Sequence, residues 1–525
     1  MDHRHPFQGL PGVVPFLLSL FLVCCPGSAV WSAGPLGNAD ILADEPPRKT
    51  IHLEWLPQSA QVDGRLLLGN LHIVPNPRLG VAFPAPDPAV ADAVLECGMG
   101  IVRMDVSWAE REPVRGQFAW DGLDNKIQHL QESGANAFLT FATDAEWGTL
   151  PSEFTSPNRV PADMADWADF VSACVERYDH DGVGDAPGML RPVDYYQFIN
   201  EWPSLNHTTG GWAGDIDQLI ATLNASHAAT KAAWPGATVI LGGIPAGALD
   251  AMVLSSGMAS YVARIAYSPD NIVFLDSLRA QSPTILESVA VRERVLAEAR
   301  YDVADMHLYG PVEFNQHRIE RVRLAAPGAG LVSAECGGPN LAYEDSVTPD
   351  SHFLAALDMN LDALARGVRF ILWFGMVERE FVVGGGTTYG NTEVPLFDQE
   401  FQPKGGYWAY CLLGSILADL KGVVKLEEGT YLIESHGRPD IIVAWAPGGS
   451  GVLELSPLEH PDLLMRVVDA ARGAFVFERI PDDGVVALTG LPVIVSEILP
   501  AGDFRPGDPP QSDPAVQALP GEQEK

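Results

Sequence analysis

Cysteine is scarce in this chain, and the few thiols do not form a recognised pattern. The sequence has six cysteines in 525 residues and no CxxC pair, which argues against a zinc site or a disulfide scaffold. Four of them, Cys97, Cys174, Cys336 and Cys411, lie far from the N-terminus and far from one another. Buried thiols are the simplest expectation, and one pairing among these four stays open. Because no histidine, cysteine and aspartate cluster has metal-ligand spacing and no glycine-rich phosphate loop is present, we expect neither a metal nor a cofactor.

Basic residues are also scarce. The chain has 33 Lys and Arg against 68 Asp and Glu, which gives a formal net charge of −35. Such an excess of negative charge repels nucleic acid and anionic membrane surfaces. We therefore expect no nucleic-acid partner and a neutral substrate.

Long apolar runs are missing as well. Residues 13–23 form an apolar run that is shorter than the roughly 18 to 20 residues of a membrane span, and no later segment reaches that length. Small residues follow at 26–29, so residues 1–29 are predicted to be a secretory signal peptide with cleavage near Ala29. We expect a secreted or periplasmic protein without an integral membrane span once mature. An uncleaved anchor is the alternative; a lipoprotein anchored at Cys24 is disfavoured by the bulky valine before it.

Short apolar runs alternate with longer amphipathic ones through the middle of the chain. Eight such units indicate an α/β fold, a (β/α)8 TIM barrel over residues 71–420. The expected strands are residues 79–83, 101–106, 137–142, 195–200, 238–242, 303–307, 330–335 and 369–374. The expected helices are residues 88–97, 123–133, 162–178, 216–233, 285–299, 351–365 and 406–420.

The character of the sequence changes beyond the barrel. Short β-rich runs between Gly, Pro and Asp turns predict a small C-terminal antiparallel β-sandwich domain at residues 421–500, and strands from 50–70 are candidates to join it. The tail at 502–525 is rich in Pro, Asp, Gln and Glu, and we expect it to be a disordered acidic segment.

Two of the apolar strands end on a glutamate. Residues 195–199 lead into Asn200 and Glu201, and residues 331–334 lead into Glu335. An apolar strand is typical of a parallel sheet, and barrel enzymes carry their chemistry at the carboxyl ends of such strands. Glycoside hydrolysis requires two carboxylates in this kind of placement, one as acid and one as nucleophile or base.

At these positions the chain resembles clan A glycoside hydrolases, most closely families 39 and 5, over residues 71–420. Asn200 and Glu201 match the acid/base signature at the end of the fourth strand, and Glu335 matches the nucleophile at the end of the seventh. The resemblance implies that Glu201 is the acid/base and Glu335 the nucleophile, and that Asn200 binds the sugar 2-hydroxyl.

Further residues support the same resemblance. Arg103, with Asp105 and Trp108, resembles the clan segment on the second strand, and His307 and Tyr309 resemble the pair beside the nucleophile. Arg103 and Tyr309 are candidate donors to Glu335.

Two tryptophans complete the expected substrate-binding set. Trp373 on the eighth strand resembles the tryptophan that stacks on the sugar, with barrel packing as the alternative, and Trp147 is a candidate for the cleft wall or the core. Two features depart from the family pattern: the histidine common after the third strand is absent, and Trp202 follows Glu201 where proline is common.

The sequence therefore predicts an exported retaining glycosidase that cleaves a β-glycosidic bond in an oligo- or polysaccharide. Two alternatives remain: a carbohydrate-binding or polysaccharide-assembly protein on the same fold, and a transglycosylase that shares the covalent intermediate. The sugar, the linkage, endo or exo action and the oligomeric state depend on loop shape and surfaces that the sequence does not specify.

Overall fold

The computed structural model describes residues 61–496, with gaps at 63–64, 72, 83–87, 153–155, 204–209, 269–270, 340–345, 379, 384–386, 391–393 and 456–462. The predicted signal peptide and the predicted acidic tail lie outside the described residues.

Eight parallel strands close into a barrel, as the sequence predicts. The strands are β3 (Asn76–Ala82), β4 (Met99–Ser107), β5 (Asn136–Ala142), β6 (Tyr195–Phe198), β7 (Thr238–Ile244), β10 (Val303–Tyr309), β11 (Gly330–Gly337) and β12 (Ile371–Phe374). Neighbours in sequence are neighbours in the barrel, and β12 pairs with β3 to close it. All eight predicted strands are present, so the predicted TIM barrel is confirmed.

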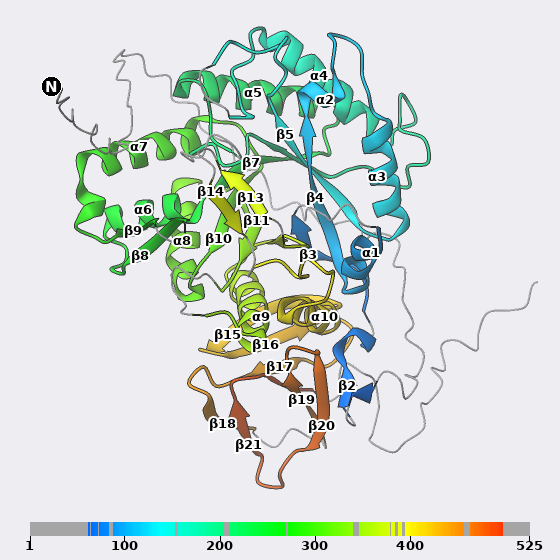
Figure 1. The fold of residues 1–525 in the computed structure, drawn as a ribbon, viewed down its shortest axis with the longest axis vertical. Coiled ribbons are helices and arrows are strands. Elements are labelled where there is room, and N and C mark those ends of the chain that lie inside the picture. The colour runs from blue at the N-terminus through cyan, green and yellow to red at the C-terminus, as the bar shows by residue number, and fades with distance from the viewer. Residues whose placement is uncertain are drawn as a thin grey trace, which may run out of the picture.

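Helices alternate with these strands and surround the barrel (Figure 1). They are α1 (Pro88–Glu96), α2 (Trp108–Arg111), α3 (Asp121–Glu132), α4 (Met164–Arg177), α5 (Ile216–Ala233), α6 (Ala246–Ser256), α7 (Pro283–Glu298), α8 (Asn315–Ala325), α9 (Pro349–Ala365) and α10 (Gly405–Ile416). Side-chain caps fix several starts; Asp215 and Gln218 form a capping box at α5. The seven predicted helices are confirmed within a few residues at each end.

The barrel interior has two layers with different chemistry. The lower layer is a cluster of buried apolar side chains to which the barrel strands β4, β5, β6, β7, β10, β11 and β12 contribute. Its members are Ile101, Phe138, Tyr195, Ile240, Val303, Val332, Ala334, Phe370 and Leu372. Two residues further along several of these strands, the inward positions are polar. Because side chains alternate faces along a strand, this second layer lies nearer the carboxyl ends.

A second, β-rich region lies below the barrel in Figure 1. Its main sheet has eight strands in the order β1-β2-β20-β19-β22-β17-β16-β15. They are β1 (Gln61–Val62), β2 (Arg65–Leu67), β15 (Leu420–Glu427), β16 (Thr430–Ser435), β17 (Ile441–Ala444), β19 (Leu463–Asp469), β20 (Ala474–Arg479) and β22 (Val493–Val495). The two N-terminal strands thus pair at one edge of a C-terminal sheet, and α9 and α10 lie between this sheet and the barrel strands.

A smaller antiparallel pair, β18 (Ser450–Glu454) and β21 (Val485–Thr489), accompanies the main sheet. Apolar side chains of both sheets, including Ala444, Leu464, Val486 and Leu488, form a separate buried cluster. The arrangement is that of two sheets packed face to face.

Several short elements lie in the connections outside the barrel strands. They are the 3-10 turns η2 (Leu68–Asn70), η3 (Arg279–Gln281) and η4 (Val312–Phe314), and the hairpins β8 (Ala263–Ser268) with β9 (Asn271–Leu275) and β13 (Glu380–Val383) with β14 (Thr387–Gly390). Within the described residues, no helix has the length and apolar character to cross a membrane.

Candidate active site

The backbone after β6 turns sharply and carries Glu201 into the barrel mouth. Ile199 has φ 63° and Glu201 has φ 45°, both in the left-handed region that β-branched residues such as isoleucine rarely adopt. A Cβ on Gly242 of β7 would lie 1.8 Å from the Ile199 carbonyl oxygen, so glycine is required where this turn meets the next strand. Conformations of this kind cost about 1–3 kcal/mol each and persist where the surroundings enforce them, often at functional sites.

A register irregularity on β11 brings Glu335 to the same mouth. The pairing with β12 shifts between Ser333 and Cys336, which breaks the two-residue alternation of side chains. Ala334 therefore belongs to the apolar interior while the adjacent Glu335 also faces inward, towards the residues of β10. The side chain of Glu335 is 7% exposed, and that of Glu201 reaches 19%.

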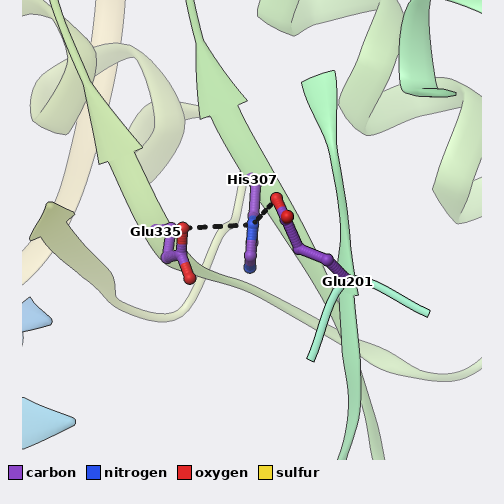
Figure 2. Close-up of side chains that lie close together, drawn as sticks. All are labelled: Glu201, His307 and Glu335. Atoms are coloured by element: carbon purple, nitrogen blue, oxygen red, sulfur yellow. Dashed lines mark hydrogen bonds and ion pairs between the residues drawn. The ribbon is translucent and has the colours of Figure 1, made fainter. Parts of the chain in front are cut away.

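His307 of β10 lies between the two glutamates (Figure 2). Its Nδ1 is 2.9 Å from Glu201 Oε1 and 3.4 Å from Glu335 Oε2. One oxygen of each carboxylate and the histidine nitrogen all lie within 4.8 Å of one another. The structure thus brings the two predicted catalytic carboxylates and the predicted histidine into one site.

Glu335 is held by two further donors, the same two that the sequence suggests. The Arg103 guanidinium donates through Nη1 to Glu335 Oε1 at 2.5 Å, and the Tyr309 hydroxyl donates to Glu335 Oε2 at 3.1 Å. Arg103 is 1% exposed. Burial lowers the pKa of Arg103, but Glu335, Asp105 and Asp305 outweigh burial and raise it, so the guanidinium stays charged. A charge-assisted bond from a buried arginine stabilises the ionised form of a carboxyl group.

His307 carries a positive charge at neutral pH. Burial lowers the pKa of this fully buried imidazole, but the carboxylates of Glu335, Asp305 and Glu201 outweigh burial and raise the pKa to about 10. The Nε2 atom lies 3.3 Å from Asp305 Oδ2, too poorly aligned for a hydrogen bond but close enough for attraction between charges. A protonated His307 places a cation within reach of both carboxylates.

A buried chain of hydrogen bonds supports the site from below. The Nε of Arg103 donates to the hydroxyl of Thr140, which donates to Gln197 Oε1, and Gln197 Nε2 donates to Asp305 Oδ2. The second oxygen of Asp305 accepts from the Ala334 amide at 2.7 Å. These residues form the polar layer directly above the apolar one. Fully satisfied buried networks of this kind fix the orientation of their members.

Asn200 is held by the same arginine. Arg103 Nη2 donates to Asn200 Oδ1 at 2.7 Å. Because a guanidinium only donates, the amide oxygen must face Arg103 and the amide NH₂ is left as a donor. This orientation suits the predicted contact between Asn200 and a sugar hydroxyl, which stays a prediction.

The structure corrects the expectation for Trp373. Its side chain is 0% exposed, packs beside His352 and Tyr410 and donates from Nε1 to the Val394 carbonyl. Since Phe370 and Leu372 face the barrel interior, the alternation along β12 turns Trp373 outward to the helices. Trp373 offers no ring face to a sugar, and the prediction of a stacking role is wrong.

Phe374, the next residue, takes the inward position. It is partly exposed, and its ring meets the ring of Tyr309 edge-on with centroids 6.4 Å apart. Tyr309 in turn contacts Glu335, so Phe374 is the aromatic side chain of β12 that lies next to the site.

Trp147 lies in the loop after β5. Its Nε1 donates to the Glu112 carbonyl at 2.9 Å, and its ring meets Trp108 edge-on at 5.1 Å. These contacts belong to an aromatic cluster outside the barrel strands that includes Trp167 and Phe170. The contacts described for Trp147 do not include either glutamate, so its predicted place in the cleft wall stays a prediction.

The sequence patterns do not indicate every residue of the site. They do not single out Thr140, Gln197 or Asp305, and they include Asp105 only as part of a longer segment. Asp105 lies near the end of β4, where reduced hydration in the barrel mouth raises its pKa to about 6, with Glu335 and Asp144 adding to the effect against Arg103. The sequence pattern that indicates such residues is the alternation of side chains along a strand. On β4, for example, every second residue from Ile101 leads to Arg103 and then to Asp105.

Similarity to solved structures supports the fold. A family 39 glycoside hydrolase from Bacteroides cellulosilyticus is 15% identical with 80% of each chain covered and a TM-score of 0.52. A glucosidase from Croceicoccus marinus is 13% identical over 79% of this chain and 94% of its own, with a TM-score of 0.53. A monomeric β-xylosidase from Caulobacter crescentus is 15% identical over 80% of this chain and 95% of its own, with a TM-score of 0.52.

At this level of identity the similarity establishes the shared barrel fold. No family model matches the sequence, and no curated protein matches it. The arrangement of the site residues therefore carries the argument about function.

Proposed function

We propose that the protein is a retaining glycoside hydrolase that acts on β-glycosidic bonds of an oligo- or polysaccharide. The observation that carries the proposal is the placement of Glu201 and Glu335 at the carboxyl edge of the barrel, with one oxygen of each within 4.8 Å. The shared fold with a β-xylosidase and a glucosidase agrees with it.

The different surroundings of the two glutamates assign their roles. Glu335 is nearly buried and accepts from Arg103 and Tyr309, so it is suited to be the ionised nucleophile that attacks the anomeric carbon. Glu201 is more exposed and accepts from His307 through Oε1, which leaves Oε2 to carry a proton for the leaving oxygen. In the second step, Glu201 takes a proton from water as the water attacks the glycosyl-enzyme.

His307 places a cation between the two carboxyl groups. As an imidazolium, it balances the negative charge of Glu335 while Glu201 holds the proton for the first step. When Glu335 loses its charge by forming the covalent bond, the imidazolium remains close to Glu201. We propose that His307 thereby assists Glu201 as it changes from acid to base.

The proximity of the carboxylates supports retention of configuration. Retaining enzymes hold their carboxyl groups about 5–5.5 Å apart, whereas inverting enzymes separate them by about 6.5–9.5 Å to admit a water molecule. Oxygens within 4.8 Å agree better with the shorter range. Proton NMR of the first product formed from an aryl glycoside would record the anomeric configuration.

A screen of aryl β-glycosides, followed by plant and bacterial polysaccharides, tests the proposed activity. We expect the wild-type protein to release the aryl group from at least one sugar, and Glu335→Gln to reduce kcat by about 10⁴-fold or more without loss of folding. Glu320→Gln changes a partly exposed glutamate on α8 and serves as the matched control. Full activity in a folded Glu335→Gln protein would exclude Glu335 as the nucleophile.

The same assay distinguishes the alternatives. Binding of a polysaccharide without bond cleavage would indicate a carbohydrate-binding or assembly protein. Transfer of the sugar to an added acceptor in preference to water would indicate a transglycosylase.

We further propose that the protein is exported to the periplasm or the medium. The support is the sequence alone, the apolar run at 13–23 followed by small residues up to Ala29. N-terminal sequencing of protein recovered outside the cytoplasm should begin directly after residue 29. An intact Met1 on that material would contradict cleavage.

A further inference from the structure

Two buried cysteines meet where the last barrel helix packs against the first βα unit. Cys97 follows α1 directly, and Cys411 lies in α10, 314 residues later in the chain. Their side chains are 0% and 1% exposed. The two Sγ atoms are 2.7 Å apart, closer than the about 3.5–4.0 Å of ordinary contact between non-bonded heavy atoms.

The backbone packing around the two sulfurs enforces this approach. A Cβ on Gly414, one turn after Cys411, would lie 2.4 Å from the Cys97 carbonyl oxygen. A Cβ on Gly98 would lie 3.1 Å from the Gly414 Cα, and Gly98 has φ +82°. The two segments touch through glycines on both sides, so the cysteines are brought together by the fold and not by the freedom of their side chains.

A hydrogen bond fixes the same junction from its other end. The buried Asn76 at the start of β3 donates from Nδ2 to the Leu417 carbonyl at 2.8 Å, immediately after α10. The backbone N–H of Asn76 also donates to the Gly98 carbonyl at 2.8 Å. The start of β3, the start of β4 and the end of α10 are thus held in one place.

We propose that Cys97 and Cys411 form a disulfide bond when the chain folds in an oxidising environment. The bond would join the first and last βα units of the barrel. A thiolate of one cysteine attacks a small-molecule disulfide or the disulfide of a thiol–disulfide oxidoreductase and displaces one thiol. The second cysteine then attacks this mixed disulfide, which closes the Cys97–Cys411 bond and releases the second thiol. Two thiols are oxidised and one external disulfide is reduced.

The bond should form during folding, while the junction still opens to reagents, and should then resist reduction. Burial, together with the neighbouring Cys411, raises the pKa of the Cys97 thiol well above its ordinary value, so the folded junction disfavours the reactive thiolate. Reagents also reach neither sulfur in the folded protein. A reductant should therefore open the bond only when the protein is partly unfolded.

The test is a thiol map of the full chain produced through an oxidising compartment. The protein is alkylated in denaturant without reductant and digested. We expect Cys97 and Cys411 to be protected from alkylation and recovered in one linked peptide pair, two hydrogens lighter than the two free peptides. Cys411→Ala should expose Cys97 to alkylation. Cys174→Ala, which removes another buried cysteine, should leave the linked pair intact.

A second measurement starts from protein whose thiols are reduced. The reduced full chain is incubated with oxidised glutathione in urea just below its unfolding transition, and the linked peptide should appear. The oxidised form should melt at least roughly 5 °C above the reduced form, because the bond closes a very long loop. Full alkylation of Cys97 and Cys411 under both conditions, or a link from Cys97 to another cysteine, would overturn the proposal.

Discussion

The two layers inside the barrel are built from the same strands but do different work. The lower layer, which includes Phe138, Tyr195 and Val303, is apolar and fully buried. Two residues further along, the same strands present Thr140, Gln197 and Asp305, which are equally buried but polar.

The difference shows how a barrel separates stability from chemistry. Burying a large apolar side chain contributes about 1.5–3 kcal/mol, and seven of the eight barrel strands place apolar side chains in the lower layer. A buried polar group gains little net stability even when it is hydrogen-bonded, and an unmatched one costs about 1–3 kcal/mol. The role of the polar layer is therefore to orient Arg103, which in turn holds Glu335.

After Glu335→Gln, replacing the proposed acid, Glu201, should have the largest effect on the catalytic rate. Glu201→Ala should slow substrates with poor leaving groups by about 10²–10⁴-fold, and activated aryl glycosides far less, because a good leaving group needs little protonation. The comparison is kcat/KM across aryl glycosides of rising leaving-group pKa. Equal losses for all leaving groups would argue against the acid role.

A pair of substitutions on β5 tests the separation of the layers. Phe138→Ala should lower the free energy of unfolding by about 3–5 kcal/mol, with kcat of the folded protein nearly unchanged. Thr140→Val should keep most of the stability but lower kcat/KM by about tenfold, because the Nε of Arg103 loses its acceptor. Denaturant unfolding and steady-state kinetics on both variants measure this. If both variants lost stability and activity in the same proportion, the two layers would not be separable.

The raised pKa of His307 predicts that the free energy of unfolding depends on pH through a residue of the barrel mouth and not of the apolar layer. Its folded-state pKa of about 10 exceeds the unfolded value of about 6.5, so its contribution to stability is complete below pH 6.5 and is lost as the pH rises through 10. The wild-type protein should therefore lose up to a few kcal/mol of unfolding free energy between pH 6.5 and 10 relative to His307→Gln. Parallel pH profiles for the two proteins would show that His307 is not charged in the folded state.

The smallest effects are expected for the neighbouring aromatic residues of β12. Trp373→Phe should destabilise the protein by about 1–3 kcal/mol and leave KM unchanged, since the ring is buried among His352 and Tyr410. Phe374→Leu should change stability less and raise KM several-fold. A raised KM for Trp373→Phe together with an unchanged KM for Phe374→Leu would instead indicate that Trp373 faces the substrate.

The sequence predicted the barrel well because eight apolar strands and their helices each carry a strong local signal. It also predicted which glutamates meet, because the carboxyl ends of parallel strands converge. It failed at Trp373 because residue type was weighed without the strand alternation that Phe370 and Leu372 define. The inward turn of Glu335 depends on a register irregularity, and the junction of Cys97 with Cys411 depends on helix packing 314 residues apart. Neither has a local sequence signal.

The central claim is that Glu335 forms a covalent bond to the sugar. The most direct measurement is mass spectrometry of the protein after incubation with a panel of 2-deoxy-2-fluoro aryl β-glycosides, which slow the second step more than the first when the leaving group is good. We expect one sugar to accumulate on the protein and peptide mapping to place it on Glu335. Turnover of ordinary substrates with inversion of configuration, or a label on any other residue, would contradict the account.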